Sequence, residues 1–549
     1  MNYLEKYIEW CEEPYFDEET KKELIPLSEE IKDRFYKDLE FGTGGLRGIL
    51  GAGTNRMNLY TVRKATQGLA DYIISRCGQD RGVAISFDSR HMSEEFSREV
   101  ASCLNANGIK TYRFSTLRPT PELSYGVRKL GCIAGIMITA SHNPAWYNGY
   151  KVYWEDGCQI TASHDQEIME AIQNVKNPSD CRTMSEAEAV SLGLYHELGE
   201  EMDDAYLSEI QNLVLHPQVV KEMSDLSIVY TPLHGTGLVP VTRLLERMGF
   251  RNVHVVEEQA CPNGDFPTVA SPNPEDLRAF DMALSLAELT DADIVLATDP
   301  DADRLGVYVK DETKKSYNAL NGNMTGILLC DYILSQRKML GTLPEHGAII
   351  KTIVTTNMVY PLAKEYGVKV EEVLTGFKYI GEKIREFEEM ESYEFLFGFE
   401  ESYGCLIGTY ARDKDGVSAA AMLCEAAAWY KKQGISLWTR LLQLYEKYGC
   451  YQERLDMETR KGETGSLQIQ GLMKEMREHL PEYIDGKKVL KVRDYLTGVV
   501  LDLESGEKTE TGLPVSDVLY FELEQGGWYC MRPSGTEPKI KYYREYIEK

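Results

Sequence analysis

The chain has 549 residues, too many for one hydrophobic core, which suggests three or four domains. Its 43% apolar and 27% charged residues are typical of a globular protein, and no apolar run is long enough to cross a membrane. The 60 basic and 87 acidic side chains give a net charge of −27, which argues against nucleic acid as a partner.

The cysteines and the first residues indicate the compartment. The twelve cysteines are scattered without a Cys-x-x-Cys pair, which fits neither a zinc site nor a disulfide framework. Residues 1–10 are acidic and lack the basic and apolar regions of a signal peptide. We therefore expect reduced thiols and a cytoplasmic location.

Glycines are concentrated at residues 41–48, which read Phe-Gly-Thr-Gly-Gly-Leu-Arg-Gly. Closely spaced glycines let a backbone approach a ligand and can direct amides at an anion. The segment is not a dinucleotide fingerprint, since Arg47 stands at the third glycine's position, and it lacks the Gly-Lys-Ser/Thr of a P-loop. A flexible turn explains the glycines equally well, but the guanidinium of Arg47 favours a phosphate contact.

Strand-like apolar runs alternate with helix-like segments through most of the chain. Such alternation is typical of βαβ units, in which helices cover both faces of a parallel sheet. Right-handed crossovers place the loops that follow the strands at one edge, where α/β sheets bind ligands. The clearest strand and helix pairs are 82–87 with 93–106, 227–230 with 238–248, 348–353 with 357–366, and 395–397 with 417–432.

Three polar stretches, at 197–204, 318–323 and 447–449, indicate where domains are joined. Shorter strand-like runs with fewer βα repeats follow the last of them. We therefore predict four domains, at residues 1–204, 205–320, 321–447 and 448–549.

A serine follows the predicted strand at 131–138. Residues 139–144 read Thr-Ala-Ser-His-Asn-Pro, so Ser141 lies on the loop that leaves the strand. Pro144 disfavours helix at Asn143, and an irregular turn therefore presents the hydroxyl. Taken alone, the segment is better explained as a polar turn that bonds its own backbone, and it is the other loops that favour a functional serine.

Three aspartates alternate after another apolar run. Asp299, Asp301 and Asp303 can direct their carboxylates at one point, as a hard cation requires, whereas without a cation their charges would repel. The loop is not an EF-hand, because Arg304 replaces the glycine and Lys310 replaces the glutamate. Solvated loop acids are the alternative. Mg²⁺ fits best, since it takes few protein carboxylates and completes its shell with phosphate or water oxygens.

A second acidic loop follows the apolar run at 395–397. Glu400 and Ser402 suit neighbouring sugar hydroxyls, because one carboxylate accepts hydrogen bonds from two of them. Segments 375–378 and 412–416 add lysines and glycines nearby, although surface lysines are usually only solvated. Sugar recognition is therefore a hypothesis that needs its context.

Near the carboxyl end, Arg532, Ser534 and Thr536 surround Gly535 after a strand-like run. One guanidinium, two hydroxyls and the backbone amides form a cradle for a phosphate monoester. An ordinary hairpin turn is the alternative, but the combination favours anion binding.

In kind and in order, these five loops resemble those of the α-D-phosphohexomutase superfamily, the phosphoglucomutases and phosphomannomutases. Segments 41–58 and 262–267 are similar to a bacterial phosphoglucomutase branch related to animal phosphopentomutase-type enzymes. The resemblance covers essentially the whole chain. It implies an α/β fold of four domains around a central cleft: three similar doubly wound α/β/α domains and a smaller C-terminal α+β domain.

The resemblance also implies roles. Ser141 would be a phosphoserine, and one of its phosphoryl oxygens would bind Mg²⁺ together with Asp299, Asp301 and Asp303. Either His142 or Lys151 would be the general base. The remaining positions implied for the reacting phosphoryl group, the sugar and the distal phosphate are, in that order, Arg47 and Arg304; Thr375, Gly376, Lys378, Glu400, Ser402 and Lys414; and Arg532, Ser534, Gly535 and Thr536.

The implied reaction interconverts a hexose 1-phosphate and a hexose 6-phosphate, with glucose the expected sugar and glucose 1,6-bisphosphate as intermediate and activator. Mannose or pentose phosphates are alternatives, and Phe399, where many relatives carry glycine, leaves the preference open. The partners are small sugar phosphates, and the enzyme is expected to be a monomer or a homodimer.

Other classes fit the residues less well. A Mg²⁺-dependent phosphatase could use Asp299 or Asp301, but Asp303 stands where such enzymes have Thr or Val. A serine hydrolase would need Gly-x-Ser-x-Gly, and Thr139 and Asn143 occupy the glycine positions. A sensor would bind sugar phosphates without converting them.

Overall fold

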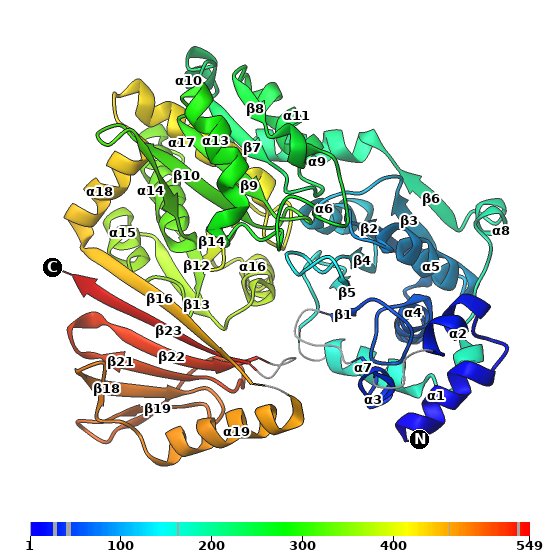
Figure 1. The fold of residues 1–549 in the computed structure, drawn as a ribbon. Helices are drawn as coiled ribbons and strands as arrows, with labels where there is room; N and C mark the ends of the chain where they lie inside the picture. Colours follow the sequence, from blue (N-terminus) through cyan, green and yellow to red (C-terminus); the bar gives the residue numbers. More distant parts are fainter. Residues whose placement is uncertain are drawn as a thin grey trace.

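The computed structural model describes residues 2–25, 30–39, 45–161, 164–460, 462–534 and 539–548. Four sheets follow one another along the chain, and their units lie in an arc (Figure 1). The first three are mixed α/β and the fourth is antiparallel, which confirms the predicted fold class. None of the described helices is long and apolar enough to cross a membrane.

The first unit has a six-stranded sheet in the order β1-β5-β4-β2-β3-β6. Strands β4, β2, β3 and β6 are parallel, and β5 runs antiparallel to β4. Every residue of β2 and β4 is buried, as expected for strands covered by helices on both faces. Its elements are β1 (Leu46–Ile49), α4 (Leu59–Ser75), η1 (Gln79–Arg81), β2 (Val83–Phe87), α5 (Ser93–Ala106), β3 (Thr111–Phe114), α6 (Thr120–Leu130), β4 (Ala134–Ile138), β5 (Tyr147–Trp154), α7 (His164–Asn174), η2 (Pro178–Asp180), α8 (Glu186–Ser191) and β6 (Tyr195–Leu198).

The second unit has five strands in the order β11-β10-β9-β7-β8, with β9, β7 and β8 parallel and β10 antiparallel to β9. Its elements are α9 (Glu200–Gln211), α10 (Pro217–Glu222), β7 (Ile228–Thr231), α11 (Leu238–Met248), β8 (Val253–Val255), α12 (Glu257–Ala260), η3 (Leu277–Phe280), α13 (Asp281–Thr290), β9 (Ile294–Thr298), β10 (Leu305–Asp311) and β11 (Ser316–Leu320).

The third unit has four strands in the order β13-β12-β14-β15, with β15 antiparallel to β14. Its elements are α14 (Gly322–Leu340), β12 (Gly347–Thr352), α15 (Val359–Tyr366), β13 (Lys369–Val373), α16 (Phe377–Met390), β14 (Glu394–Glu400), β15 (Gly404–Ile407), α17 (Gly416–Lys432) and α18 (Leu437–Tyr448).

The three units share one strand pattern. In each, the first parallel strand lies between the second and the third, and an antiparallel strand borders the third, as in β5-β4-β2-β3, β10-β9-β7-β8 and β15-β14-β12-β13. The loop between the third parallel strand and its antiparallel neighbour therefore occupies the same topological place three times.

The fourth unit is an antiparallel sheet in the order β16-β23-β22-β21-β18-β19-β20, with β17 paired to β18. Ile469 and Met473 of α19 pack on one face, while Tyr520, Trp528 and Tyr543 on the other face meet the third unit. Its elements are β16 (Cys450–Thr459), α19 (Gly462–Glu478), β17 (Tyr483–Ile484), β18 (Lys487–Asp494), β19 (Val499–Asp502), β20 (Lys508–Glu510), β21 (Leu519–Leu523), η4 (Glu524–Gly526), β22 (Trp528–Pro533) and β23 (Lys539–Glu548).

Within residues 2–25 and 30–39, three short helices precede the first sheet: α1 (Tyr3–Glu12), α2 (Glu18–Leu24) and α3 (Ile31–Phe35). Trp10 stacks on Phe16, with ring centroids 4.3 Å apart, and packs edge-on against Tyr60 of α4. This aromatic cluster attaches the segment to the first unit.

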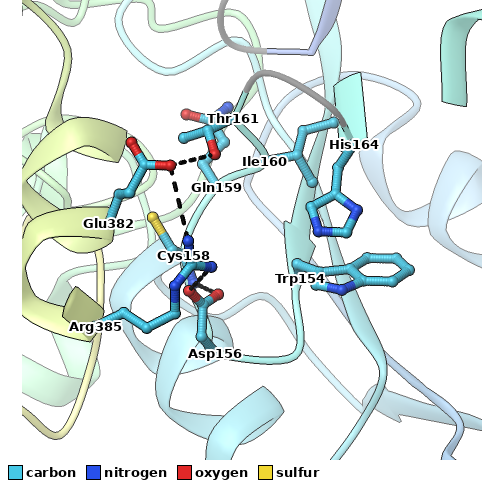
Figure 2. A pocket seen from close by; sticks show the side chains of 9 residues that line it. All are labelled: Trp154, Asp156, Cys158, Gln159, Ile160, Thr161, His164, Glu382 and Arg385. Carbon is cyan, nitrogen blue, oxygen red and sulfur yellow. Dashed lines mark hydrogen bonds and ion pairs between the residues drawn. The ribbon is translucent and has the colours of Figure 1, made fainter. Parts of the chain in front are cut away.

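Polar contacts join the first and third units beside a small pocket (Figure 2). Arg385 Nη1 of α16 lies 3.1 Å from Asp156 Oδ2, and Thr161 Oγ1 donates to Glu382 Oε1 over 3.0 Å. The pocket holds about 10 Å³, room for one water molecule.

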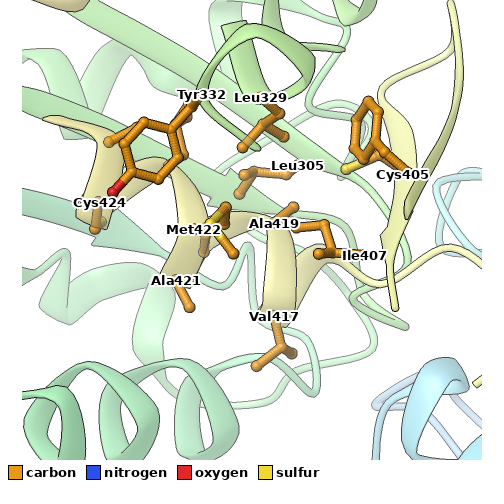
Figure 3. Close-up of a cluster of buried hydrophobic side chains, with 14 of the residues drawn as sticks. Leu305, Leu329, Tyr332, Cys405, Ile407, Val417, Ala419, Ala421, Met422 and Cys424 are labelled. Atoms are coloured by element: carbon orange, nitrogen blue, oxygen red, sulfur yellow. The ribbon is translucent and has the colours of Figure 1, made fainter. Parts of the chain in front are cut away.

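One hydrophobic core runs through the first three units. Figure 3 shows part of it, with labelled side chains from the second and third units. Its centre is α17, whose small alanines let strands and helices approach from all sides, so that nearly the whole helix is buried. Met422 and Cys424 of α17 lie close to Tyr332 of α14 in the close-up. Because the three units share this core, hydrophobic contacts continue across the boundaries between them.

The predicted helices 93–106 and 238–248 are confirmed to the residue, and the other predicted pairs to within a few residues. The limits set at 204, 320 and 447 fall within α9, at the end of β11 and in the last turn of α18. The four-domain division at these limits stays a prediction.

Candidate active site

Two loops that are far apart in the sequence meet between the first and second units. Ser141 follows β4, Asp299 follows β9, and Ser141 Oγ donates a hydrogen bond of 2.6 Å to Asp299 Oδ2. Only 3% of Ser141 and none of Asp299 is exposed. Thr120, at the start of α6, donates through its hydroxyl to Asp301 Oδ2 over 2.8 Å, which ties the aspartate loop to the first unit.

The Ser141 loop has an unusual backbone. Ser141 has a φ of 51°, in the left-handed region, which costs about 1–2 kcal/mol for a residue with a side chain. Its N–H donates to Thr139 Oγ1 over 2.7 Å, and Thr139 Oγ1 donates to Asp88 Oδ2 over 2.6 Å. These bonds hold the conformation that turns the hydroxyl towards Asp299.

The three aspartates form a buried cluster. One carboxylate oxygen from each of Asp299, Asp301 and Asp303 lies within 4.8 Å of the other two. The Oδ1 atoms of Asp301 and Asp303 are buried and have no hydrogen-bond partner among the described residues. Burial, followed by the two neighbouring charges, raises the pKa of Asp299 well above its ordinary value. A divalent cation would satisfy these oxygens and relieve the repulsion.

Two lysines already offset part of this charge. Lys151 Nζ lies 2.7 Å from Asp301 Oδ2 and 3.4 Å from Asp303 Oδ2, and Lys414 Nζ lies 3.2 Å from Asp303 Oδ2. Burial would lower the pKa of Lys151, but the two carboxylates outweigh it and raise this pKa. Lys151 therefore holds its proton.

His142 lies next to the serine hydroxyl. Its Nδ1 lies 3.2 Å from Ser141 Oγ. Burial, followed by the charges of Arg304 and Arg47, lowers the pKa of His142 well below its ordinary value. The imidazole is therefore neutral. Arg47 donates to Asn143 Oδ1 over 2.9 Å, so the predicted phosphate-binding arginine does lie beside the serine loop.

The third unit brings its acidic loop to the same centre. Glu400 ends β14, and burial, partly opposed by Lys414, raises its pKa to about 7. Lys414 connects Glu400 electrostatically to Asp303 and also lies 3.0 Å from Asp413 Oδ1. A Cβ at Gly404 would lie 2.2 Å from Lys414 Cδ, so only glycine leaves room for the lysine stem. Ser402 lies two residues after Glu400, and its hydroxyl acts to lower the pKa of that carboxyl.

Phe399, the residue that departs from many relatives, belongs to the core. It is fully buried, stacks on Phe397 at 5.3 Å, and would meet a Cβ at Gly326 at 2.1 Å. Its side chain therefore packs on α14 and not in the loop around Glu400.

Thr375, Gly376 and Lys378 lie at the start of α16. Gly376 has a φ of 122°, a conformation that favours glycine, and Thr375 Oγ1 is buried without a partner in the described part of the chain. Lys378 Nζ is 3.9 Å from Asp165 Oδ2, and burial lowers its pKa. The structure therefore places Lys378 at the border with the first unit.

The loop at the carboxyl end joins β22 to β23. Arg532 and Ser534 are described, whereas Gly535 and Thr536 lie outside the described residues. Lys541 is directly opposite Arg532 in the ladder and shares its face of the sheet. Burial, partly opposed by Glu401, lowers the pKa of Lys541.

Sequence reasoning missed Lys541, Thr120 and Arg90. The first could have been found from alternation along 539–541, which places it on one face with Lys539. The other two have no local signature, because they act on loops that lie 181 and 51 residues further along the chain.

Models of one family match three parts of the chain. Alpha/beta/alpha domain I of phosphoglucomutase/phosphomannomutase matches residues 38–179, domain II residues 204–313 and domain III residues 321–448.

Individual relatives agree. The phosphoglucomutase of Staphylococcus epidermidis is 38% identical over 517 residues, which covers 94% of this chain and 92% of the relative. That of Staphylococcus aureus is 37% identical over 514 residues, covering 94% and 90%.

Solved structures share the fold. A putative phosphomannomutase from Thermus thermophilus superposes with a TM-score of 0.67 at 21% identity, covering 93% of this chain and 96% of the other. The phosphoglucomutase pp63/parafusin from Paramecium gives 0.67 at 17% identity, covering 93% and 91%. The chain therefore belongs to the phosphoglucomutase/phosphomannomutase family and is a phosphohexomutase, an isomerase that moves a phosphoryl group on a sugar phosphate.

Proposed function

We propose that the enzyme interconverts α-D-glucose 1-phosphate and glucose 6-phosphate through a phosphoserine at Ser141 and a bound glucose 1,6-bisphosphate. The observation that carries this proposal is the 2.6 Å contact between Ser141 Oγ and Asp299 Oδ2. It brings a hydroxyl acceptor to the edge of a carboxylate cluster that suits a cation. Relatives that are 37–38% identical and carry the name phosphoglucomutase support glucose as the sugar.

Mg²⁺ fits the aspartate cluster. Asp299, Asp301 and Asp303 would hold it together with an oxygen of the phosphorylated serine, leaving the usual positions for water. When bound, Mg²⁺ neutralises charge on the transferring phosphoryl group. Lys151 keeps the cluster compact, because its ammonium bonds two of the three carboxylates.

The proton of the serine oxygen passes to and from His142. In the resting enzyme the hydroxyl donates its proton to Asp299, so His142 receives this proton only when the hydroxyl turns towards its neutral Nδ1, 3.2 Å away. Lys151 is the fixed cation instead, since its ammonium is committed to Asp301 and Asp303. Arg47 and Arg304 supply permanent positive charge beside the phosphoryl group.

The substrate would lie between this centre and the fourth unit. Glu400 and Ser402 accept and donate hydrogen bonds to sugar hydroxyls, with Lys414, Thr375, Gly376 and Lys378 around them. Arg532, Ser534, Gly535 and Thr536, joined by Lys541, bind the phosphate that is not being transferred. The bisphosphate must turn over between the two steps, so either of its phosphates must fit either place.

The decisive experiment is Ser141→Ala. The variant should fold normally, lose turnover of glucose 1-phosphate, and take up no phosphate from glucose 1,6-bisphosphate by intact-mass measurement. Ser402→Ala is the matched control, because it removes a hydroxyl in the third unit and should still take up one phosphate. Substantial mutase activity in Ser141→Ala would refute the role of this serine.

Sugar preference is tested by comparing glucose, mannose and ribose 1-phosphates, each with its own bisphosphate. The largest kcat/KM should belong to glucose. Release of free phosphate without isomerisation would favour a phosphatase. We also infer a cytoplasmic monomer or homodimer, which localisation and light scattering would test.

A further inference from the structure

Arg90 lies on the loop between β2 and α5, and its guanidinium contacts the backbone of the Ser141 loop. Its Nη2 donates to the carbonyl oxygens of Ser141, at 2.5 Å, and Asn143. Its Nη1 donates to those of Pro144, at 2.8 Å, and Tyr147, at 3.1 Å. One planar guanidinium thus bonds four carbonyls on both sides of the turn, which a lysine ammonium cannot reproduce.

Both backbone groups of Ser141 depend on this one pair. Arg90 Nε lies 3.4 Å from Asp88 Oδ2, and neither side chain is exposed to solvent. Asp88 holds the N–H of Ser141 through Thr139, while Arg90 holds its carbonyl. A charge buried this deeply is costly unless it is well bonded, and here its bonds go to the nucleophile loop.

The second unit covers the guanidinium. The ring of Phe266 lies 5.0 Å from Arg90 Cζ, and Phe266 has a φ of 47°, which is strained for an aromatic residue. The loop around it fits closely on the first unit. A Cβ at Gly264 would lie 2.7 Å from the backbone nitrogen of His91, whose ring bonds Asp265 over 2.7 Å.

We propose that Arg90, covered by Phe266, is a positioning residue for phosphoryl transfer. It holds the loop in the left-handed conformation that presents Ser141 Oγ to Asp299. Because Phe266 belongs to the unit that also supplies Asp299, correct seating of that unit and the shape of the serine loop depend on each other. This inference rests on the proposed role of Ser141 as the phosphoryl carrier.

The test is Arg90→Lys in the full-length enzyme. The charge remains, but the carbonyls lose their fork of donors, and a nucleophile displaced by about 1 Å costs about 10²-fold in rate. We expect kcat to fall by that factor, with KM for glucose 1-phosphate changed by less than about threefold. The rate at which glucose 1,6-bisphosphate phosphorylates Ser141 should fall in parallel with kcat.

Arg113 offers a matched control. It is also a buried arginine of the first unit, lies over the Phe87 ring at 4.8 Å, and donates to Ser97 Oγ over 2.8 Å. Neither of these contacts involves the serine loop. Arg113→Lys should lower the melting temperature as Arg90→Lys does, yet keep kcat within about twofold. Equal losses of kcat in both variants would mean a merely structural role and would overturn the proposal.

A milder pair of variants decides the matter if Arg90→Lys fails to fold. Phe266→Leu removes the ring over the guanidinium and should lower kcat about fivefold, since such a contact is worth about 1 kcal/mol. Phe280→Leu, in the core of the same unit, should not lower kcat. Equal kcat in Phe266→Leu and wild type would overturn the inference.

Ser141→Ala is run in parallel to separate the two hypotheses. An active Ser141→Ala enzyme refutes the proposed function. An inactive one, together with a wild-type kcat in Arg90→Lys, refutes only the positioning role.

Discussion

The proposed transfer centre around Ser141 and the proposed distal phosphate loop at Arg532 are built in different ways. Ser141 and the aspartate cluster are almost fully buried between two rigid α/β units and are joined by bonds across the boundary. Arg532 and Ser534 lie half-buried on a hairpin of the antiparallel unit. Chemistry needs donors and charges that are fixed before the reaction, whereas in the proposed function the distal loop would have to release one phosphate and accept another.

The transfer centre also repeats one topological solution. Ser141 and the aspartates come from the loops after β4 and β9, and Glu400 ends β14, the same strand in three similar sheets. The distal loop comes from a different architecture. This contrast predicts that changes at the centre reduce the rate of chemistry, and that changes at the distal loop weaken binding.

Asp301→Asn should have the largest effect. It removes a charge from the cation site and weakens the acceptor of Lys151 and Thr120, so kcat should fall by about 10³-fold with weaker Mg²⁺ activation. Kinetics during Mg²⁺ titration measure both. Asp276→Asn, at an exposed pair with Arg278, is the control. An unchanged Mg²⁺ response would contradict the assigned site.

Glu400→Gln tests whether burial of the charged Glu400 side chain lowers the free energy of unfolding. Burial raises the folded-state pKa of Glu400 from 4.5 to about 7. Its contribution to stability is therefore present below pH 4.5 and is lost as the pH rises through 7. Relative to wild type, the variant should gain about 3 kcal/mol in unfolding free energy between pH 4.5 and 8.

Urea unfolding of the ligand-free enzyme at both pH values measures this gain. The same variant should raise KM, because one of the two carboxylate oxygens that accept from sugar hydroxyls becomes an amide NH₂ group, which can only donate. If the unfolding free energies of the variant and wild type change with pH in the same way, burial of the Glu400 carboxylate does not destabilise the folded enzyme.

Lys541→Gln tests the proposed distal phosphate loop. The residue lies opposite Arg532 on the face that would bind the distal phosphate. Loss of one charge-assisted hydrogen bond should raise KM for glucose 1-phosphate about 10–100-fold with little change in kcat. Lys491→Gln, paired with Asp502 elsewhere in the same sheet, is the control. A fall in kcat with an unchanged KM would contradict the prediction that changes at the distal loop weaken binding and leave the rate of chemistry unchanged.

Thr120→Val should have the smallest effect. It removes one hydrogen bond to Asp301 and nothing that touches substrate, so about 1 kcal/mol of Mg²⁺ affinity, or about fivefold, should be lost. Mg²⁺ titration of activity measures it. Added Mg²⁺ should restore kcat, and a loss that excess Mg²⁺ cannot restore would contradict a purely supporting role.

Much of this enzyme can be predicted from its sequence, because the signals are local. Periodicity predicted α5 and α11, and short apolar runs followed by Ser141 or by Asp299, Asp301 and Asp303 indicated strand-end loops with chemistry. Turn residues and carboxylates keep their preferences wherever the chain later places them.

Tertiary structure alone decided how these loops combine. The contact of Ser141 with Asp299 spans 158 residues, and neither segment carries a sign of the other. Arg90 has no distinguishing feature in the sequence. It supports the serine loop only because folding buries its guanidinium, where it donates hydrogen bonds to four carbonyl oxygens. Side-chain preference is a property of neighbours along the chain, but burial and pairing depend on which distant segments pack together.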